Sequence, residues 1–309
     1  YMLNHMEIFQ CYKDYGQTDD GSIFDDIKAV LSTFLFSREL ALVQDAEYVT
    51  DSAIDRMGRN RNDPFCLFLH YWDVHTPYNC PRRFQAYMGR DPERRLLDRY
   101  VGAVRYVDEQ LGRLFRWMDR RGILDDTVVV LTSDHGESLT EHGIYFDHHG
   151  LYDVNTHVPL IFRYPSGLPR GERVGGFVQH VEVAPTILEL AGLSGNAECY
   201  DGKSLMPAIE QGSTDRSCVY SEESYVQNKR SIRTERYRYI KAVDGEGYCR
   251  YCHTVHEGAE ELYDLSRDPS EQTNVVHDRP AVAQRLRDQL DEFVRELEER
   301  RTWVDDAEQ

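Results

Sequence analysis

The chain has 309 residues, and its 40% hydrophobic and 29% charged content is typical of a globular protein with one sizeable domain and a smaller one. Its formal net charge of −18 at pH 7 argues against nucleic acids and anionic membranes as partners, and no apolar run approaches the roughly 20 residues that span a bilayer. The seven cysteines, an odd number at irregular spacing, do not fit a disulfide framework.

The start of the chain and its lack of glycosylation acceptors bear on the cellular location. The first ten residues lack the basic start and the apolar core of a secretory signal, and no Asn-x-Ser/Thr acceptor occurs. Together with the free cysteines, these features favour a cytoplasmic location. Because the chain begins with Tyr1 rather than Met, we expect its true N-terminus to lie further upstream.

The first half of the chain alternates predicted helices and strands. Apolar residues at three- and four-residue spacing predict a helix over 22–59, and the apolar run Phe65–Leu69 predicts a strand that leads directly into His75. A second helix is predicted over 95–121, with an apolar stripe from Leu97 to Met118. A helix followed by a strand is half of a βαβ unit, so we expect a mostly parallel sheet.

The central segment Asp126–Leu160 has the highest concentration of chemically useful side chains, including five of the twelve histidines. Its run Thr127–Leu131 shows no alternation, which is typical of a strand buried on both faces of a parallel sheet. Asp134 and His135 follow this strand, at the position where open α/β sheets hold their ligands. An acid beside an imidazole at that position predicts a divalent-cation site.

The second half of the chain has a different pattern. A strand over 158–162 and a helix over 183–190 come first, and short β-type runs then alternate with turns. We therefore predict an α/β domain over residues 1–212 and a small subdomain over 213–309 with an antiparallel sheet and a terminal helix that Pro280 opens. The predicted strands of the subdomain are 218–221, 231–234, 237–242 and 261–265.

A series of short motifs follows in order from about Glu47 to the last helix. They include His75-Thr76-Pro77-Tyr78, Thr132–Glu137, Glu141-His142-Gly143, His157–Ile161, Ala184–Gly192, Asp201–Leu205, Arg233–Ile240, Glu261–Leu265 and Asp268-Pro269. This order of motifs resembles the sulfatases of the alkaline-phosphatase superfamily. The resemblance implies an α/β fold with a mostly parallel sheet between helices, of which residues 1–212 are the C-terminal portion of the catalytic domain, followed by a small α+β subdomain.

The resemblance assigns roles to individual residues. Asp134 matches the family's second metal-binding acid, and His135 matches the adjacent ligand; the metal implied is Ca²⁺, with Mg²⁺ or Mn²⁺ as alternatives. His75 matches the histidine that binds the sulfate ester near its leaving group. The family's sulfate-binding lysine falls on His148, with His149 as the alternative, and an imidazole replaces an ammonium group only near or below its pKa.

The nucleophile of this family is a formylglycine made from the first residue of a Cys/Ser-x-Pro-x-Arg motif, and these 309 residues contain no such motif. The resemblance therefore implies a sulfuric ester hydrolase acting on a small-molecule or carbohydrate sulfate ester, with the formylglycine outside this chain and the chain alone inactive. Two alternatives stay open. One is a phosphodiesterase, phosphonate hydrolase or phosphotransferase of the same superfamily, and the other is a sulfate- or phosphate-binding relative without catalysis.

A second group of candidate ligands lies near the C-terminal end. Cys249, Cys252 and His253 match the haem attachment pattern Cys-x-x-Cys-His, which we interpret as a chance match because no signal peptide accompanies it. With His256, the same residues suit a structural zinc site, although four ligands so close in sequence would be crowded.

Overall fold

The computed structural model describes residues 6–8, 45–59, 64–87, 89–193, 200–251 and 253–307. The chain divides into two compact units, Tyr1–Leu124 and Asp125–Gln309, and each is described by itself. The predicted domain boundary at residue 212 lies inside the second unit and stays a prediction. Among the described residues, no helix combines the length and the apolar character needed to cross a membrane.

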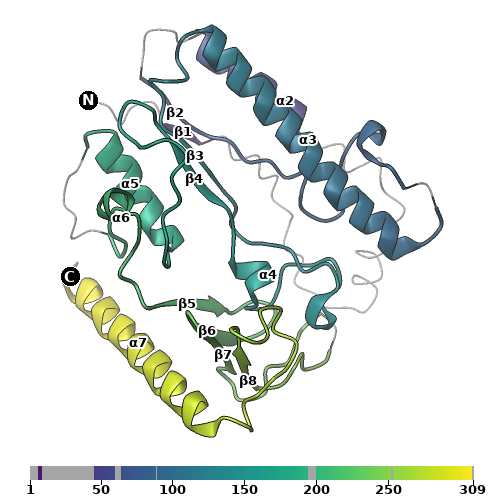
Figure 1. Cartoon of the computed structure of the whole chain (residues 1–309), viewed down its shortest axis with the longest axis vertical. Helices are drawn as coiled ribbons and strands as arrows, with labels where there is room; N and C mark the ends of the chain where they lie inside the picture. The colour runs from purple at the N-terminus through teal and green to yellow at the C-terminus, as the bar shows by residue number, and fades with distance from the viewer. Residues whose placement is uncertain are drawn as a thin grey trace. The chain divides into compact units, whose positions relative to one another are not determined.

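The first unit is built around two packed helices, α2 (Ala46–Arg59) and α3 (Pro92–Arg120) (Figure 1). Ala53 and Met57 of α2 pack against Leu114 and Met118 of α3. The predicted helices are confirmed where they are described, and the part of the first prediction before Asp45 lies outside the described residues. α3 begins one turn earlier than predicted because the Asp91 carboxylate accepts hydrogen bonds from the first backbone N–H groups of the helix.

The buried face of α3 differs from the predicted stripe at its N-terminal end. Leu97, Val101 and Val104 are exposed, whereas Gly102 and Ala103 are buried. A Cβ atom on Gly102 would lie 2.9 Å from the carbonyl oxygen of Phe84, so the preceding loop approaches the helix too closely for a larger residue. Small residues therefore form the buried face of α3 at its N-terminal end. A prediction from hydrophobicity alone assigns the buried face there to the wrong residues.

A short parallel pair of strands completes the first unit. β1 (Met6–Ile8) pairs in parallel with β2 (Cys66–Phe68), the strand predicted at 65–69. The chain after β2 carries His75 and a single 3₁₀ turn, η3 (Arg82–Phe84), before it enters α3.

In the second unit, β3 (Val129–Thr132) and β4 (Leu160–Arg163) form an antiparallel pair. Both strands were predicted, but β3 was expected in parallel pairing with both faces buried, and its residues are only partly buried. The connection between the two strands explains the pairing. Its helical turns, η4 (Glu141–Gly143) and α4 (Asp153–Thr156), are too short to act as the crossover helix that parallel strands need.

Three short helical elements follow β4: η5 (His180–Glu182), α5 (Val183–Leu190) and α6 (Met206–Gln211). The bounds of α5 coincide with the prediction, and Gly192 ends the helical region with a φ of 68°. α6 ends at Gly212, whose φ of 79° is the left-handed conformation that glycine adopts without strain.

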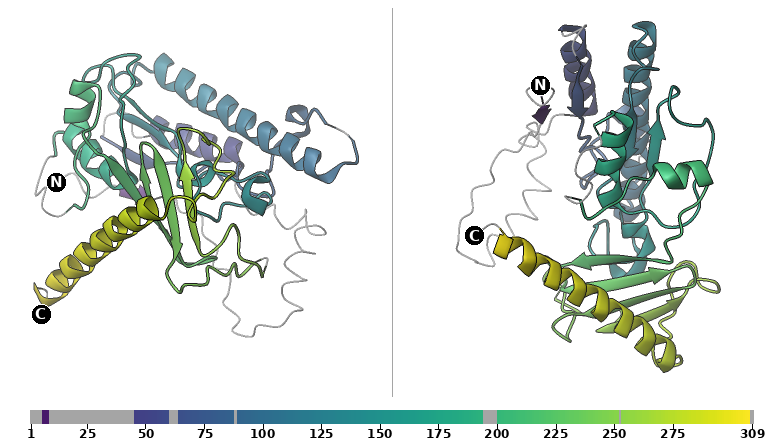
Figure 2. Two further views of the ribbon diagram at one scale, coloured as in Figure 1. Left: turned by 60° about the horizontal axis from the view of Figure 1, so that its bottom comes forward. Right: turned by 90° about the vertical axis from the view of Figure 1, so that its left-hand side faces the viewer.

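The C-terminal part of the second unit is an antiparallel sheet in the order β5-β6-β7-β8. Figure 2 shows the last helix, α7 (Pro280–Ala307), lying across this sheet. Leu286 and Leu290 of α7 pack on Ile232, Tyr239 and Leu262 of the sheet, as the periodicity of the helix predicted. The strands are β5 (Cys218–Glu223), β6 (Lys229–Thr234), β7 (Tyr237–Ala242) and β8 (Glu260–Asp264), close to their predicted ranges.

The opposite face of the sheet is covered by the central segment Asp126–Leu160, hereafter the histidine-rich segment. Successive side chains of a strand point to opposite faces, so Ile240 and Tyr263 point away from α7. They form a second buried cluster with Ile144, Leu151 and Tyr152 of the segment between β3 and β4. The sheet is therefore the support on which the candidate site is built.

Candidate active site on the histidine-rich segment

Asp134 and His135 lie directly after β3, as predicted. The Oδ2 atom of Asp134 is 3.7 Å from Nε2 of His135, and the Asp134 side chain is exposed. Nδ1 of His135 lies 2.8 Å from the carbonyl oxygen of Gly136. A carbonyl can only accept, so Nδ1 carries the proton and Nε2 presents a lone pair on the side of the Asp134 carboxylate.

These two residues fit a divalent cation. Carboxylate oxygens bind Ca²⁺ at about 2.3–2.6 Å, and imidazole nitrogens bind metals at about 2.1 Å, so two donors on one ion lie at most about 4.5 Å apart. The separation of 3.7 Å satisfies this limit without movement of the backbone. Two donors do not complete a coordination shell, and the remaining ligands would come from other residues or from water.

The loop that carries this pair is fixed by backbone hydrogen bonds to α4. The N–H of Gly136 donates to the carbonyl of Asn155 at 2.7 Å, and the N–H of Glu137 donates to the carbonyl of Val154 at 3.1 Å. A Cβ atom on Gly136 would lie 2.0 Å from the Val154 carbonyl oxygen, so only glycine permits this approach. Close backbone packing therefore requires glycine at the position after Asp134 and His135.

The segment also brings His148 to His135. The two imidazole rings stack with their centroids 4.2 Å apart and an angle of 19° between their planes. His148, the position that matches the family's sulfate-binding lysine, therefore lies next to the candidate metal ligands. Because His148 is partly exposed, its ring is accessible to a ligand on this side of the segment.

Asp147 was not predicted as a site residue, yet it links the two adjacent histidines. Its Oδ1 atom lies 3.3 Å from Nδ1 of His148 and 3.5 Å from Nδ1 of His149. Burial alone would raise the pKa of the Asp147 carboxyl, but its contacts with His149 and His148 outweigh burial and lower this pKa. The sequence signal that marks it is the run Asp-His-His itself.

The segment is held on the sheet by a buried charge network. Arg238 of β7 is 1% exposed; it donates to the Leu151 carbonyl at 2.5 Å and pairs with Asp153 and Glu271. Arg233 makes two further hydrogen bonds to Asp153, at 2.8 and 3.0 Å. These contacts fix the start of α4 and, through it, the loop after β3.

A second buried network stabilises the same contact. The carboxylate of Glu261 accepts hydrogen bonds from Tyr152 and Tyr263, both at 2.9 Å, and from Lys229 at 2.6 Å. Burial raises the pKa of Glu261, and the fully buried lysine opposes this shift. Tyr152 also stacks on the buried ring of His142, with centroids 3.6 Å apart.

His75 belongs to the first unit, so its position relative to Asp134 and His148 is not defined. Its Nδ1 atom lies 2.8 Å from the carbonyl oxygen of Thr76, and its ring stacks on Trp72 with centroids 4.4 Å apart. The ring is therefore held in one orientation at the end of the loop after β2. The substrate-binding role predicted for His75 stays a prediction.

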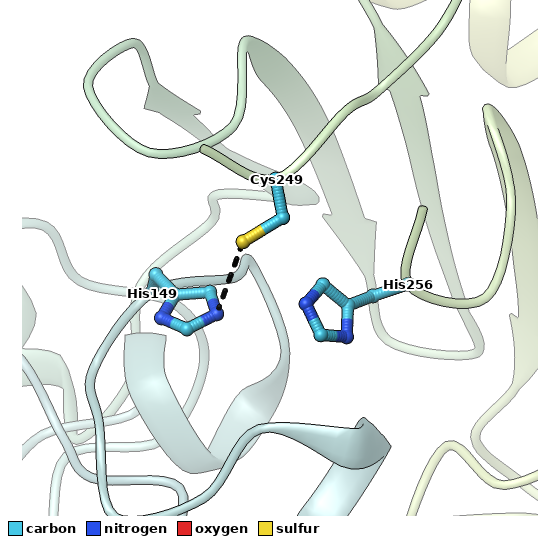
Figure 3. A group of neighbouring side chains, drawn as sticks. All are labelled: His149, Cys249 and His256. Atoms are coloured by element: carbon cyan, nitrogen blue, oxygen red, sulfur yellow. Dashed lines mark hydrogen bonds between the residues drawn. The ribbon is translucent and has the colours of Figure 1, made fainter. Parts of the chain in front are cut away.

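The residues of the predicted zinc site are only partly brought together. Cys249 and His256 are buried and gather with His149, as Figure 3 shows. His253 is exposed, and its Nδ1 atom lies 3.0 Å from the hydroxyl of Tyr248. Cys252 lies outside the described residues. The combination of His149 with Cys249 and His256 was not foreseen from the sequence.

Comparison with known proteins decides the family. A family model described as Sulfatase matches residues 10–193, which is more than half of the chain. The chain belongs to the sulfatase family. A second model, described as N-sulphoglucosamine sulphohydrolase, C-terminal, matches residues 140–300 and covers the sheet that supports the site. The resemblance predicted from the sequence is confirmed.

Three characterised relatives illustrate the range of the sulfatase family. N-acetylglucosamine-6-O-sulfatase of Bacteroides thetaiotaomicron is 32% identical over 203 residues, which are 62% of this chain and 32% of that protein. Arylsulfatase K of Gallus gallus is 29% identical over 231 residues, 71% of this chain and 40% of that protein. A multifunctional alkaline phosphatase superfamily protein of Trinickia caryophylli is 32% identical over 199 residues, 61% and 38% of the two chains. The chain matches about a third to two fifths of the length of these relatives.

Solved structures confirm the predicted fold class. A structure determined in complex with its substrate D-glucosamine-2-N,6-O-disulfate has a TM-score of 0.66 at 22% identity, covering 82% of this chain and 70% of the other. A phosphonate monoester hydrolase of Agrobacterium radiobacter has a TM-score of 0.53 at 28% identity, covering 64% and 41% of the two chains.

Proposed function

We propose that this chain contributes to a sulfuric ester hydrolase that cleaves a sulfate monoester, with a sulfated carbohydrate as the substrate class. Membership of the sulfatase family supports the reaction. The substrate class is supported by a relative that acts as an N-acetylglucosamine-6-O-sulfatase and by a structural neighbour that binds a disulfated glucosamine.

In this proposal, Asp134 and His135 hold a divalent cation, Ca²⁺ in first place and Mg²⁺ or Mn²⁺ as alternatives. When bound, the cation neutralises negative charge on the sulfate oxygens. His148 binds the sulfate beside it, and its contact with Asp147 keeps the ring oriented. His75 and His149 are the further substrate-binding candidates, and the formylglycine nucleophile is supplied by a residue outside these 309.

The observation that carries the proposal is the arrangement after β3. An exposed carboxylate and an imidazole lie 3.7 Å apart, and the ring of His148 stacks on that imidazole at 4.2 Å. The groups proposed to bind the metal and the sulfate are therefore neighbours on one segment, which supports the proposal because hydrolysis of a sulfate ester needs both.

Metal binding by the purified chain tests the site. Calorimetric titration with Ca²⁺ is expected to give one binding event that Asp134→Asn abolishes, because the carboxylate charge is lost while the size of the side chain is kept. Asp126→Asn is the matched control, since this exposed carboxylate lies on the same segment before β3. Equal Ca²⁺ affinity in the Asp134 variant and the wild type would refute the assignment.

A second candidate function is hydrolysis of a phosphonate or phosphate ester, favoured by the likeness to the phosphonate monoester hydrolase and to the multifunctional superfamily protein. Comparing kcat/KM for an aryl sulfate, N-acetylglucosamine 6-sulfate and an aryl phosphonate on the full gene product separates the two functions. A preference for the phosphonate would overturn the sulfatase proposal. Turnover by the 309-residue chain alone would contradict a nucleophile outside it.

A further inference from the structure

Three buried side chains gather beneath the candidate active site. His149 is 7% exposed, Cys249 is 0% and His256 is 8%, and one ligand atom from each lies within 4.8 Å of the other two. The thiol sulfur of Cys249 is 3.8 Å from Nε2 of His149. Figure 3 shows the three side chains pointing toward one another, His149 from the histidine-rich segment and the other two from the connection between β7 and β8.

The imidazole of His256 is oriented from behind, in the manner of a metal ligand, because its Nδ1 atom lies 3.2 Å from the carbonyl oxygen of His142. Nδ1 of His149 faces the carboxylate of Asp147 at 3.5 Å, without a hydrogen bond between them. A histidine that binds a metal usually donates its other ring N–H to a carboxylate or a backbone carbonyl. Nε2 of His149 faces the thiol of Cys249, at the centre of the cluster.

The ligand types select the metal. One cysteine thiolate and two imidazoles suit Zn²⁺, whereas Ca²⁺ and Mg²⁺ prefer oxygen ligands. In a tetrahedral zinc site with Zn–S near 2.3 Å and Zn–N near 2.1 Å, neighbouring donors lie about 3.4–3.6 Å apart. The sulfur–nitrogen distance of 3.8 Å is close to this value, and all three ligand atoms lie within 4.8 Å of one another, so side-chain rotation can bring them onto one ion.

We propose that His149, Cys249 and His256 bind one zinc ion, with a water completing the tetrahedron. The site goes beyond the proposed sulfatase function, because it is separate from the cation site proposed for Asp134 and His135. It joins the histidine-rich segment to the β7–β8 connection. The zinc fixes His149, and thereby holds its neighbour His148 at the sulfate-binding position.

The surroundings of the cluster are built to keep this geometry. Cys249 donates its backbone N–H to the Thr254 carbonyl at 2.8 Å, and the N–H of His253 donates to the Cys249 carbonyl at 3.0 Å. Lys229 donates to the carbonyl oxygens of His256 and Gly258, both at 3.1 Å. The two ligands from this connection are therefore held by one small hairpin, which lowers the entropy lost on metal binding.

The test is elemental analysis of the purified chain after dialysis against a calcium-selective chelator. We expect one zinc per chain in the wild type, none in Cys249→Ser and His256→Asn, and one in the control Cys66→Ser, whose thiol is exposed on β2. Less than half a zinc in the wild type with zinc supplied, or an unchanged zinc content in Cys249→Ser, would overturn the proposal.

Cobalt substitution gives a readout that does not depend on the stability of a cysteine variant. Co²⁺ bound by the apo wild type should show the near-ultraviolet charge-transfer band of a thiolate ligand, and its absence would exclude Cys249 as a ligand. Asp147→Asn should keep the band and weaken zinc affinity by about 10- to 100-fold, because the carboxylate behind His149 is lost. Asp134→Asn should leave zinc binding unchanged, which separates this site from the proposed calcium site.

Discussion

Asp73, two residues before His75, is expected to make the first unit less stable as pH rises. It is 3% exposed; its Oδ1 atom accepts a hydrogen bond from the N–H of Ala46 at 3.2 Å, and its Oδ2 atom has no hydrogen-bond partner among the described residues. Burial raises the pKa of the Asp73 carboxyl to about 6, from an ordinary value near 3.8. The charged form is therefore disfavoured in the folded chain.

The protonation states of Asp73 in the folded and unfolded chain determine how stability changes with pH. Below about pH 4, Asp73 is protonated in both the folded and the unfolded chain, and burial has no penalty. As pH rises through 6 the folded chain must bury a charge, which costs about 3 kcal/mol at 1.36 kcal/mol for each pKa unit. Asp73→Asn keeps the acceptor for Ala46 and removes this penalty. The variant should gain about 3 kcal/mol of stability relative to wild type between pH 4 and pH 7.

Urea unfolding followed by tryptophan fluorescence measures this difference in a Trp303→Phe background, since Trp72 and Trp117 belong to the first unit and Trp303 to the second. At each pH, the free energy of unfolding of wild type is subtracted from that of the variant. The change of this difference with pH is the quantity to compare, because any pH-independent effect of the amide cancels. Asp119→Asn, at an exposed position of α3, is the control and should show a flat difference. A difference for Asp73→Asn that is equal at pH 4 and pH 7 would refute the reasoning.

Three further predictions concern the second unit, whose unfolding in urea is followed by circular dichroism because Trp72 and Trp117 report on the first unit. Arg238→Met should destabilise the second unit by about 3–5 kcal/mol, because the substitution leaves the buried Glu271 without its cation. Adding Glu271→Gln should restore part of this loss, and additive losses in the double variant would count against the pairing. Leu286→Ala should cost about 2–5 kcal/mol, whereas the exposed Leu297→Ala should be nearly neutral, and equal costs would disprove the assigned face of α7. Burial lowers the pKa of His142 to about 4, so between about pH 6.5 and 4 the unfolded chain binds a proton that the folded chain does not, and stability falls as pH falls. His142→Phe should remove this loss of stability, and an unchanged fall in the free energy of unfolding over the same pH range would contradict the prediction.

Much of the secondary structure was predictable because local signals agree with tertiary packing. The helix Val183–Leu190 and the strand Tyr237–Ala242 were predicted with their observed bounds. The inward face of α3 was not, because the close approach of Phe84 selects Gly102, and no hydrophobicity pattern reports such an approach. The antiparallel pairing of β3 was missed because a buried apolar run is compatible with either direction of its neighbour.

The candidate site was predictable only where its residues are close in sequence. Asp134 and His135 lie together after β3 because one short loop carries both. The meeting of His149 with Cys249 spans 100 residues and depends on how the segment covers the sheet, which spacing rules cannot encode. Asp147 escaped notice because its importance comes from two histidine contacts rather than from a motif position.

The two-sided burial of the C-terminal sheet has a consequence for how this protein can be divided or recombined. A chain cut at Gly212 would retain Leu151 and Tyr152 but lose Ile240 and Tyr263, against which they pack. The excised piece would expose an apolar surface together with the unpaired carboxylate of Asp153, so aggregation is the expected fate of such a truncation. Exchange of C-terminal segments between relatives is accordingly constrained: a donor sheet must bring matching partners for both its helix and the histidine-rich segment. The histidine-rich segment and the last hundred residues must therefore be exchanged together, although their separation in sequence suggests two independent parts.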